Sequence, residues 1–191
     1  MITVGIDHSI NSTGVCISNG EKTQWILISS VEKPNKMMRK LSELNDVTIM
    51  TYERTGDNLI DGQRVGKIIF EAIKELQRLW KENELTIVKE DYAYSAQWNT
   101  LVQLEEHSSL MVYTIEKELG VTIHKISPKS IKKAFTGNGN SNKDAMHVTF
   151  VNTDIKGPFH NFCCKYDKAQ KHVNDLVDSY AIMKMCTSDA Y

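Results

Sequence analysis

The sequence predicts a single α/β domain built on a mixed β-sheet. Three short apolar runs, at residues 1–5, 14–18 and 24–30, follow one another near the N-terminus with turn residues between them, which is typical of a meander of three antiparallel strands. Farther along the chain, helical and strand-like stretches alternate. A meander followed by alternating helices and strands favours a sheet whose faces are covered by helices.

Two long helices and two short strands are expected in the middle of the chain. Between residues 59 and 80, apolar side chains recur every three or four residues, which is the period of one buried helical face. Residues 101–119 return to this spacing. Short β-rich runs at 85–88 and 121–126 lie on either side of the second helix, so strands and helices alternate through this region.

The last third of the chain combines short helices with irregular segments. Ser127 followed by Pro128 indicates an N-cap and a first helical position, and the glycine-rich run 137–142 interrupts regular structure. Residues 154–171 contain glycine, proline, histidine and cysteine without periodicity, so we expect an irregular insertion there. Helices are expected at residues 128–135, 143–151 and 173–186.

Length and composition restrict the class of protein. The 191 residues fit one domain over 1–191, and 41% apolar with 25% charged residues exclude intrinsic disorder. No apolar run approaches the roughly 18 residues that cross a bilayer, and Asp7 interrupts the stretch where a signal peptide needs its apolar region. The four cysteines do not have the spacing of a disulfide framework. We therefore expect a cytoplasmic protein with no membrane contact.

Four acidic residues lie at the ends or on one face of expected elements. Asp7 ends the first strand, Glu90 follows the run at 85–88, and Asp175 and Asp178 are one turn apart on the last helix. Taken singly, each acid also fits an ordinary role, as a strand-end acid, a helix N-terminal acid or a solvated side chain. Gathered together, carboxylates repel one another unless a cation lies among them, and oxygen ligands in this number suit Mg²⁺ or Mn²⁺.

Positive charge is concentrated in one stretch, although the net charge of the chain is −1. Residues 121–147 contain five lysines and the single acid Asp144, which gives a local charge of +4. A stretch of this kind favours contact with a polyanion. The five lysines are Lys125, Lys129, Lys132, Lys133 and Lys143.

Four stretches of the chain resemble the motifs of one family, in that family's order. The first runs from Gly5-Ile6-Asp7 to Gly14, and the second, at 88–92, contains Glu90. The third, at 127–143, is the most distinctive, because a Gly-Asn-Gly loop is followed, after three intervening residues, by Lys143. The fourth, at 174–181, contains Asp-x-x-Asp. With these motifs the chain resembles the RuvC-type Holliday junction resolvases of the RNase H-like superfamily.

The resemblance implies an RNase H-like fold with a five-stranded mixed sheet, in which parallel strands extend the antiparallel meander and helices flank both. It implies a metal-dependent endodeoxyribonuclease that resolves four-way DNA junctions as a homodimer. It also implies two Mg²⁺ or Mn²⁺ ions per active site, bound by Asp7, Glu90, Asp175 and Asp178, with Lys143 neutralising phosphate charge. The other implied DNA contacts are Lys125, Lys129, Lys132, Lys133, Asn138 and an aromatic residue that stacks at the crossover, Tyr94 or Trp98.

Three alternatives remain on the same residues. One is an RNase H-like nuclease that cuts flap or branched DNA or RNA-containing duplexes, and another is a junction-binding protein without activity. A nucleotide-binding module of the actin and sugar-kinase type opens with a similar strand, but it normally needs two such domains, about twice this length. Within the resemblance, the connection at 152–172 is longer than in the bacterial enzymes, which indicates a phage-type member.

The histidines and cysteines near the C-terminus raise two further hypotheses. His160, Cys163, Cys164 and His172 offer the ligand types that zinc prefers, although their spacing fits no standard zinc finger, and two half-buried cysteines packed in a loop is the simpler interpretation. His172 also precedes Asp175 by three residues, close enough to assist the metal site, although a histidine at a helix N-terminus needs no such role.

Overall fold

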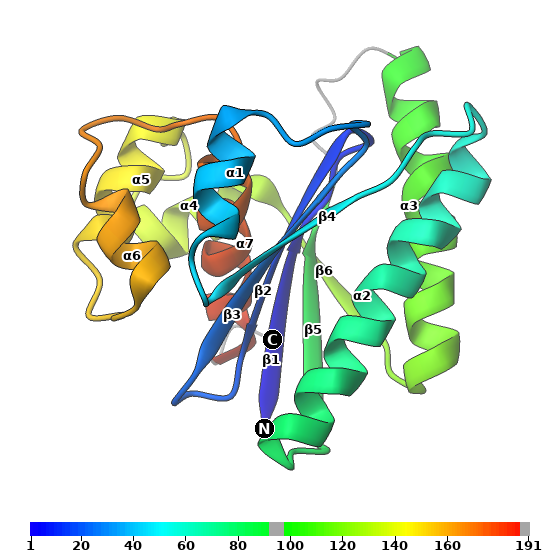
Figure 1. Ribbon diagram of the computed structural model, residues 1–191, viewed down its shortest axis with the longest axis horizontal. Coiled ribbons are helices and arrows are strands. Elements are labelled where there is room, and N and C mark those ends of the chain that lie inside the picture. Colours follow the sequence, from blue (N-terminus) through cyan, green and yellow to red (C-terminus); the bar gives the residue numbers. More distant parts are fainter. Residues whose placement is uncertain (92–97, 188–191) are drawn as a thin grey trace.

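The computed structural model describes residues 1–91 and 98–187 and has an α/β fold, with one mixed sheet between two layers of helices (Figure 1). The sheet order is β4-β3-β2-β1-β5-β6. The strands are β1 (Ile2–Asp7), β2 (Ser12–Ser18), β3 (Thr23–Ser29), β4 (Val47–Thr51), β5 (Leu85–Glu90) and β6 (Ile123–Ile126). The first three pair antiparallel, and each of the others pairs in parallel with its neighbour. The predicted meander and its parallel extension are therefore both present.

The sheet has six strands, so the expectation of five is wrong. The additional strand, β4, pairs with β3 at one edge and is preceded by the short helix α1 (Lys36–Ser42). Val47 is buried, but Thr48 and Met50 on the same strand are exposed. A short strand with so few buried positions gives little apolar signal, which is why periodicity did not reveal it.

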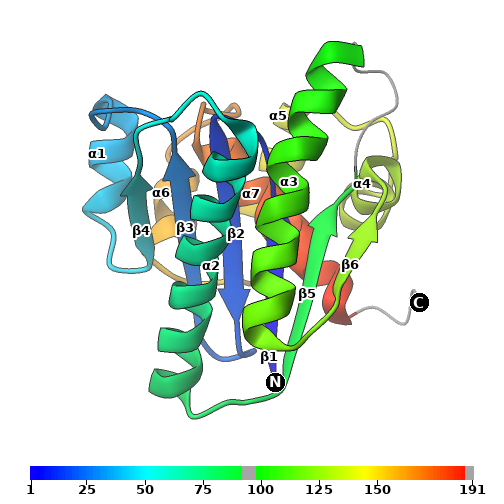
Figure 2. The ribbon, with the colours of Figure 1, turned by 90° about the vertical axis from the view of Figure 1, so that its right-hand side faces the viewer.

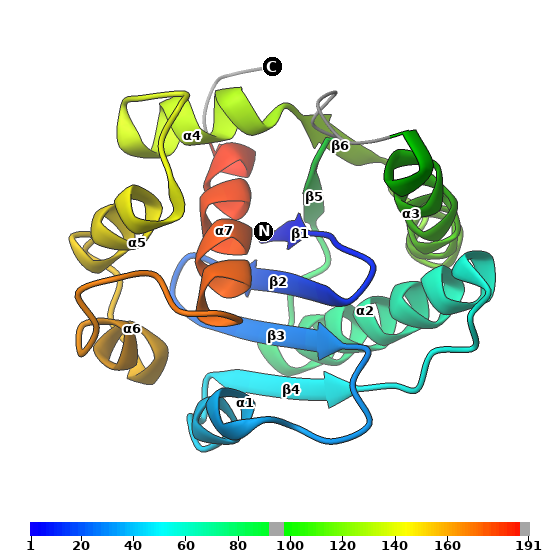
Figure 3. The same ribbon diagram turned by 90° about the horizontal axis from the view of Figure 1, so that it is seen from above.

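Two helices cover one face of the sheet and the other helices cover the opposite face (Figures 2 and 3). The first layer is α2 (Asn58–Trp80) and α3 (Trp98–Leu119). The second layer is α4 (Pro128–Thr136), α5 (Lys143–Val151), α6 (Pro158–Cys163) and α7 (Val173–Lys184), with α1 beside it and a 3₁₀ turn, η1 (Met185–Thr187), after it. None of the helices in the described ranges combines the length and apolar character needed to cross a bilayer.

The expected irregular insertion at 154–171 is ordered in part, because it contains α6. The helix starts at Pro158, and the backbone N–H of Phe159 donates to both carboxylate oxygens of Asp46, at 3.1 and 3.0 Å. Phe159 and Phe162 are buried in the core between the sheet and α7. A helix this short leaves no recognisable period, and its cap comes from a residue more than a hundred positions away.

Glycines let α7 lie directly on the sheet. A Cβ atom on Gly5 would collide with the backbone of Met183, and one on Gly14 would collide with the backbone carbonyl of Asp175. Both glycines belong to the first of the four motifs, so that motif encodes the close approach of helix and strands as well as an acid. Because side chains alternate along β1, Asp7 faces the same way as Gly5, toward α7.

Candidate active site

The four predicted acids line one cavity of about 320 Å³ at the C-terminal edge of β1 and β5. Its walls also include two of the predicted lysines. The lining residues are Asp7, Ser9, Glu90, Ile131, Lys132, Lys143, Met146, Asp175, Asp178 and Ile182. A larger cavity of about 720 Å³ lies around Met1 and Lys184 at the other end of the sheet, but its only carboxylate is Asp154, so it offers no cluster of acids.

The topology explains why residues so far apart in the sequence meet. β1 and β5 are parallel neighbours, with Ile6 opposite Lys89, so Asp7 and Glu90 come side by side where both strands end. Helix α7 supplies the other two acids from consecutive turns. The cavity is therefore built from two strand ends and one helix that rests on them.

The environments of Asp7 and Asp178 disfavour their charged forms. Burial raises the pKa of Asp7 well above its ordinary value, and the negative charges of Asp178, Glu90 and Asp175 raise it further, against the opposing charge of Lys143. Burial also raises the pKa of Asp178 to about 7, with Lys143 opposing and Glu90 and Asp175 adding to the shift. Among the described residues, neither carboxylate accepts a hydrogen bond. The two acids therefore lack hydrogen-bond donors for their charged forms, and Lys143 offsets the cost of their charge only in part.

Asp175 is held by neighbouring side chains instead. The hydroxyl of Ser12 donates to Asp175 Oδ2 at 2.6 Å, and His172 Nδ1 lies 3.7 Å from the same oxygen. Burial raises the pKa of Asp175, but the contacts of His172 and Ser12 together with the charge of Lys143 outweigh burial and hold that pKa below its ordinary value. His172 is fixed in turn, because its Nε2 lies 2.9 Å from the Nδ2 of Asn35, the N-cap of α1. His172 is thus in contact with Asp175.

The environment of Glu90 is intermediate between that of Asp7 and Asp178 and that of Asp175. Burial raises its pKa, while the positive charges of Lys132, Lys89 and Lys143 lower it in part.

The sequence did not reveal two residues that support the site, Ser12 and Asn35. A serine on a strand and an asparagine in a loop have no regular spacing relative to the acids. Only the interval between His172 and Asp175 was visible in the sequence.

The donor set of the cavity fits hard divalent cations. The four acids offer only oxygen ligands, and two lysines are too few to neutralise four carboxylates. A bound cation would offset both the repulsion among the carboxylates and the cost of burying their charge. In the described part of the chain, no three His, Cys, Asp or Glu side chains are already gathered closely enough to hold an ion as they stand. The cavity is therefore chemically suited to Mg²⁺ or Mn²⁺, and ligand side chains would have to move inward to coordinate it.

The predicted lysines lie in two positions relative to the cavity. Lys132 and Lys143 line it. Lys125, Lys129 and Lys133 are exposed on β6 and α4, outside the cavity but continuous in sequence with its wall. Asn138 is exposed in the loop before α5, where its side-chain oxygen accepts from the backbone of Asn140 and its carbonyl accepts from Ser141. Asn138 therefore also shapes the loop that precedes Lys143.

The two predicted stacking residues differ in what the structure describes. Trp98 is the first residue of α3 and is 75% exposed, an unusual degree of exposure for a tryptophan. Tyr94 lies outside the described residues.

The four residues considered for zinc have other surroundings. Cys163 is buried in the core next to Phe159, whereas Cys164 is exposed, with its Sγ 3.8 Å from His160 Nδ1. His172 lies against Asn35 and Asp175. The expectation of two half-buried cysteines in a loop is wrong, because Cys163 is fully buried as the last residue of α6 and Cys164, the C-cap of that helix, is exposed.

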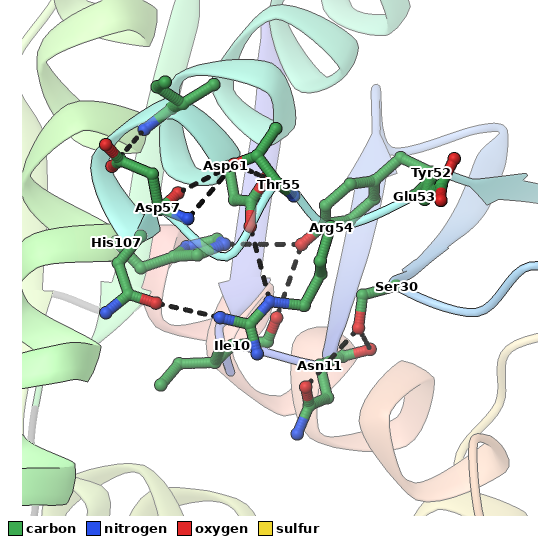
Figure 4. Close-up of polar contacts among 12 residues, drawn as sticks. Ile10, Asn11, Ser30, Tyr52, Glu53, Arg54, Thr55, Asp57, Asp61 and His107 are labelled. Carbon is green, nitrogen blue, oxygen red and sulfur yellow. Dashed lines mark hydrogen bonds and ion pairs between the residues drawn. The ribbon is translucent and has the colours of Figure 1, made fainter.

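A further buried carboxylate, Asp61, lies at the same end of the sheet but in the α2–α3 layer (Figure 4). Its Oδ1 accepts from the backbone N–H and the hydroxyl of Thr55, both at 3.0 Å, and its Oδ2 accepts from Arg54 Nε at 3.3 Å. Burial raises the pKa of Asp61, but these donors outweigh burial and lower that pKa below its ordinary value. Nothing in the sequence separated this acid from a solvated residue in the first turn of a helix.

The segment after Asp7 is tied to the same layer. His8 Nε2 lies 2.9 Å from His107 Nδ1 on α3, and His107 Nε2 lies 3.4 Å from the hydroxyl of Tyr52. That hydroxyl donates to the carbonyl of Ile10 at 3.3 Å. The turn that follows Asp7 is therefore anchored to α3 and to the end of β4, which fixes the strand end from the side opposite the cavity.

Comparison with known proteins gives one sequence relative and several solved structures. No family model matches the chain. The crossover junction endodeoxyribonuclease RuvC of Brachyspira hyodysenteriae is 25% identical over 146 residues, which cover 76% of each chain.

The solved structures share the fold at low sequence identity. Thermus thermophilus RuvC matches with a TM-score of 0.52 and 16% identity, over 96% of this chain and 91% of that one. The same enzyme in complex with a Holliday junction substrate matches with a TM-score of 0.55 and 13% identity, over 95% and 92%. The yeast mitochondrial Holliday junction resolvase matches with a TM-score of 0.51 and 16% identity, over 94% and 75%. Together with the relative, these structures support the RuvC-type resolvase family that the four motifs resemble.

Proposed function

We propose that this protein is a crossover junction endodeoxyribonuclease, which uses divalent metal to cut four-way DNA junctions at paired phosphodiester bonds. The observation that carries the proposal is the convergence of Asp7, Glu90, Asp175 and Asp178 with Lys132 and Lys143 in one cavity. The fold of the RuvC structures and the name of the sequence relative support the substrate class.

The four carboxylates are proposed to hold two Mg²⁺ or Mn²⁺ ions. When bound, these cations activate a water and stabilise the charge that develops on the phosphate being cut. Asp7 and Asp178, whose pKa values are raised, gain most from a positive charge, because no donor in the described residues compensates them. The contacts of Ser12 and His172 orient Asp175 so that its oxygen faces the cavity in one position.

Lys143 and Lys132 are proposed to act on the DNA phosphates. Lys143 is the first residue of α5, whose N-cap Asn142 accepts from the backbone of Ala145, so its position is fixed beside the acids. Its ammonium group is placed to contact a non-bridging oxygen of the phosphate at the cavity, and Lys132 to contact a neighbouring phosphate. Lys125, Lys129, Lys133 and Asn138 extend this contact along the backbone.

An aromatic residue after β5 is proposed to stack on an unpaired base at the crossover. Trp98 supports this idea by its exposure, and Tyr94 lies in the segment between Glu90 and Trp98. Such a contact is worth roughly 1 to 3 kcal/mol per base.

We also propose that residues 1–191 act as one domain and that the protein is a phage-type member working in a host cytoplasm. We propose in addition that it is a homodimer, because paired cuts in a two-fold junction need two sites.

Cleavage of defined substrates tests the function directly. End-labelled four-way junction, flap and RNA–DNA hybrid of equal arm sequence are incubated with wild type in Mg²⁺ or Mn²⁺, and with Asp178→Asn as the control for contaminating nucleases. We expect symmetrically paired nicks in the junction by wild type only. Faster cleavage of the flap or the hybrid would replace the proposed substrate, and cleavage that persists in Asp178→Asn would remove the proposed site.

A further inference from the structure

A second concentration of positive charge lies on the α-β unit that the sequence pattern did not reveal. The cations of this unit, which we call the α1 cations, are Lys33 in the loop before α1 and Lys36, Arg39 and Lys40 on the helix, and no acid interrupts residues 33–42. All four are exposed, whereas Met38 and Leu41 of the same helix are fully buried. Asn35 caps the helix by accepting from the backbones of Met37 and Met38. The cations are therefore presented on a rigidly packed element.

The connection between α6 and α7 adds further cations at the same place. Lys165, Lys168 and Lys171 are exposed there, with Asp167 the only acid of residues 164–171. The hydrogen-bond contact of 2.9 Å between Asn35 and His172 joins the start of α1 to the end of this connection. We call the α1 cations together with these three lysines the cationic flank.

The cationic flank has no internal compensation. Across the described residues, none of its side chains lies within ion-pair distance of a carboxylate. With the bordering acids Glu32 and Glu43 included, seven cations stand against three acids, a local charge of +4 in a protein whose net charge is −1, so this charge is a local feature and not a general one. Uncompensated positive charge on one face is typical of a surface that binds a polyanion.

The flank and the Lys125–Lys143 stretch lie on opposite sides of the proposed active site. Viewed from above, α7, which carries Asp175 and Asp178, lies between α1 and α4 (Figure 3). The two regions belong to opposite edges of the sheet, because α1 precedes β4 and α4 follows β6. Five strand spacings separate those edges, about 24 Å, which is twice the roughly 12 Å width of a DNA major groove. Because phosphates follow one another about every 3.4 Å along each strand, a single duplex that touched both regions would have to lie across the cavity for about seven base pairs.

We propose that the cationic flank binds the phosphate backbone of a second arm of a branched DNA, while the Lys125–Lys143 stretch holds the arm that is cut. This inference rests on the proposed function and assigns a surface that the four motifs do not include. It gives the additional α1–β4 unit a role in recognising branched DNA over linear DNA, since a junction offers a separate arm to each region, whereas a linear duplex would have to follow one straight path across both.

The test compares binding of a four-way junction with binding of a linear duplex of the same arm sequence, in EDTA, over a range of salt concentrations. The variant is Lys36→Ala/Arg39→Ala/Lys40→Ala, and a second is Lys165→Ala/Lys168→Ala/Lys171→Ala. The matched control, Lys22→Ala/Lys67→Ala/Lys74→Ala, removes three exposed lysines from the β2–β3 turn and from α2. All substituted positions are exposed, and thermal unfolding checks that the variants fold.

We expect both flank variants to lose roughly tenfold or more in affinity for the junction, with a slope of log affinity against log salt that is shallower by about 2 to 3. Affinity for the linear duplex changes less than about twofold, and the control retains both affinities. An unchanged affinity and salt slope for the junction would overturn the proposal. An equal loss of affinity for the linear duplex would also overturn it, because the cationic flank and the Lys125–Lys143 stretch would then bind one duplex.

The outcome is separable from that of the proposed function. If wild type prefers flap DNA to the four-way junction, the same comparison is made between flap and linear duplex; a selective loss on the flap then supports the flank while the junction-resolving function fails. If wild type binds no branched DNA better than linear duplex, both are overturned.

Discussion

Two kinds of carboxylate lie at one end of the sheet, on opposite faces. Asp61, in the α2–α3 layer, accepts three hydrogen bonds from Thr55 and Arg54, and its pKa is lowered. Asp7 and Asp178, beneath α7, accept none among the described residues, and their pKa values are raised. The difference separates an acid whose charge stabilises the fold from acids whose charge is costly until a ligand supplies the missing partner.

The largest expected effect that sharpens this comparison is on cleavage. Asp7→Asn and Asp178→Asn remove charges that the proposed cations need, so junction cleavage should fall by about 10³-fold or more. In EDTA, each variant should be as stable toward urea as wild type or more stable, because a repelled charge has been removed. Asp61→Asn should retain cleavage per folded molecule. If Asp7→Asn lost cleavage because it no longer folds, Asp7 would be a structural acid like Asp61.

The next effect is on stability. Asp61→Asn leaves the Thr55 and Arg54 donors without their anionic acceptor in a buried position, so we expect a loss of about 1 to 3 kcal/mol in the free energy of unfolding, measured by urea denaturation. The matched control is Asp57→Asn in the same turn of chain. Asp57 is exposed and caps α2, and asparagine caps equally well, so this change should be nearly neutral. Equal losses in the two variants would show that Asp61 has no special structural role.

A smaller effect is expected where a neighbour orients a proposed ligand. Ser12→Ala removes the 2.6 Å hydrogen bond to Asp175 and should lower metal affinity or cleavage by about 10- to 100-fold, with the Mn²⁺ concentration for half-maximal cleavage raised. Ser109→Ala on α3, an exposed serine that contacts Glu105, is the control. Unchanged Mn²⁺ dependence in Ser12→Ala would mean that Asp175 needs no such support.

The smallest expected effect is on the pH dependence of the metal-free protein. The pKa of Asp178 is about 7 in the fold and about 3.9 when unfolded, so between these values the folded state retains a proton that the unfolded chain has lost. The free energy of unfolding in EDTA therefore falls as pH rises from about 4 to 7. Asp61 has the opposite sign: its pKa is lowered, so its contribution is present above about 4 and is lost as pH falls.

Urea denaturation at pH 5 and pH 7.5 separates the two. Between pH 5 and pH 7.5, the free energy of unfolding should fall less in Asp178→Asn than in wild type, because the titrating group is gone. The two decreases should differ by on the order of 1 kcal/mol. The same pH dependence in both proteins would show that Asp178 has an ordinary pKa.

The sequence predicted the acids of the cavity better than it predicted their surroundings. Strand ends and helical spacing are local, so Asp7, Glu90, Asp175 and Asp178 were placed by short-range pattern and by motif order. Burial of Asp61 depends on Thr55 and Arg54 in a loop and on the close packing of α3, none of which leaves a period in the sequence. The contact between Ser12 and Asp175 spans 163 positions and is equally invisible locally.

The same limit applies to the fold, where elements with a strong local period were predicted and short elements were not. The meander and the long helices have strong apolar periods, and both are present. The strand β4 and the helix α6 are short and depend on distant partners, β3 for the one and Asp46 for the other, so neither was foreseen. The cationic flank was missed for the same reason, because its two segments are separated by more than a hundred residues and meet only through Asn35 and His172.

The central claim, that the cavity acids form a cation site, is tested most directly by Mn²⁺-dependent thermal unfolding without DNA. A ligand at 100 times its Kd stabilises a protein by about 2.7 kcal/mol, which raises the Tm of a chain this size by roughly 5 to 10 °C. Wild type and Asp61→Asn should both show this rise from their own metal-free Tm, whereas Asp7→Asn and Asp178→Asn should lose most of it. A full rise in Asp178→Asn, or no rise in wild type, would contradict the account.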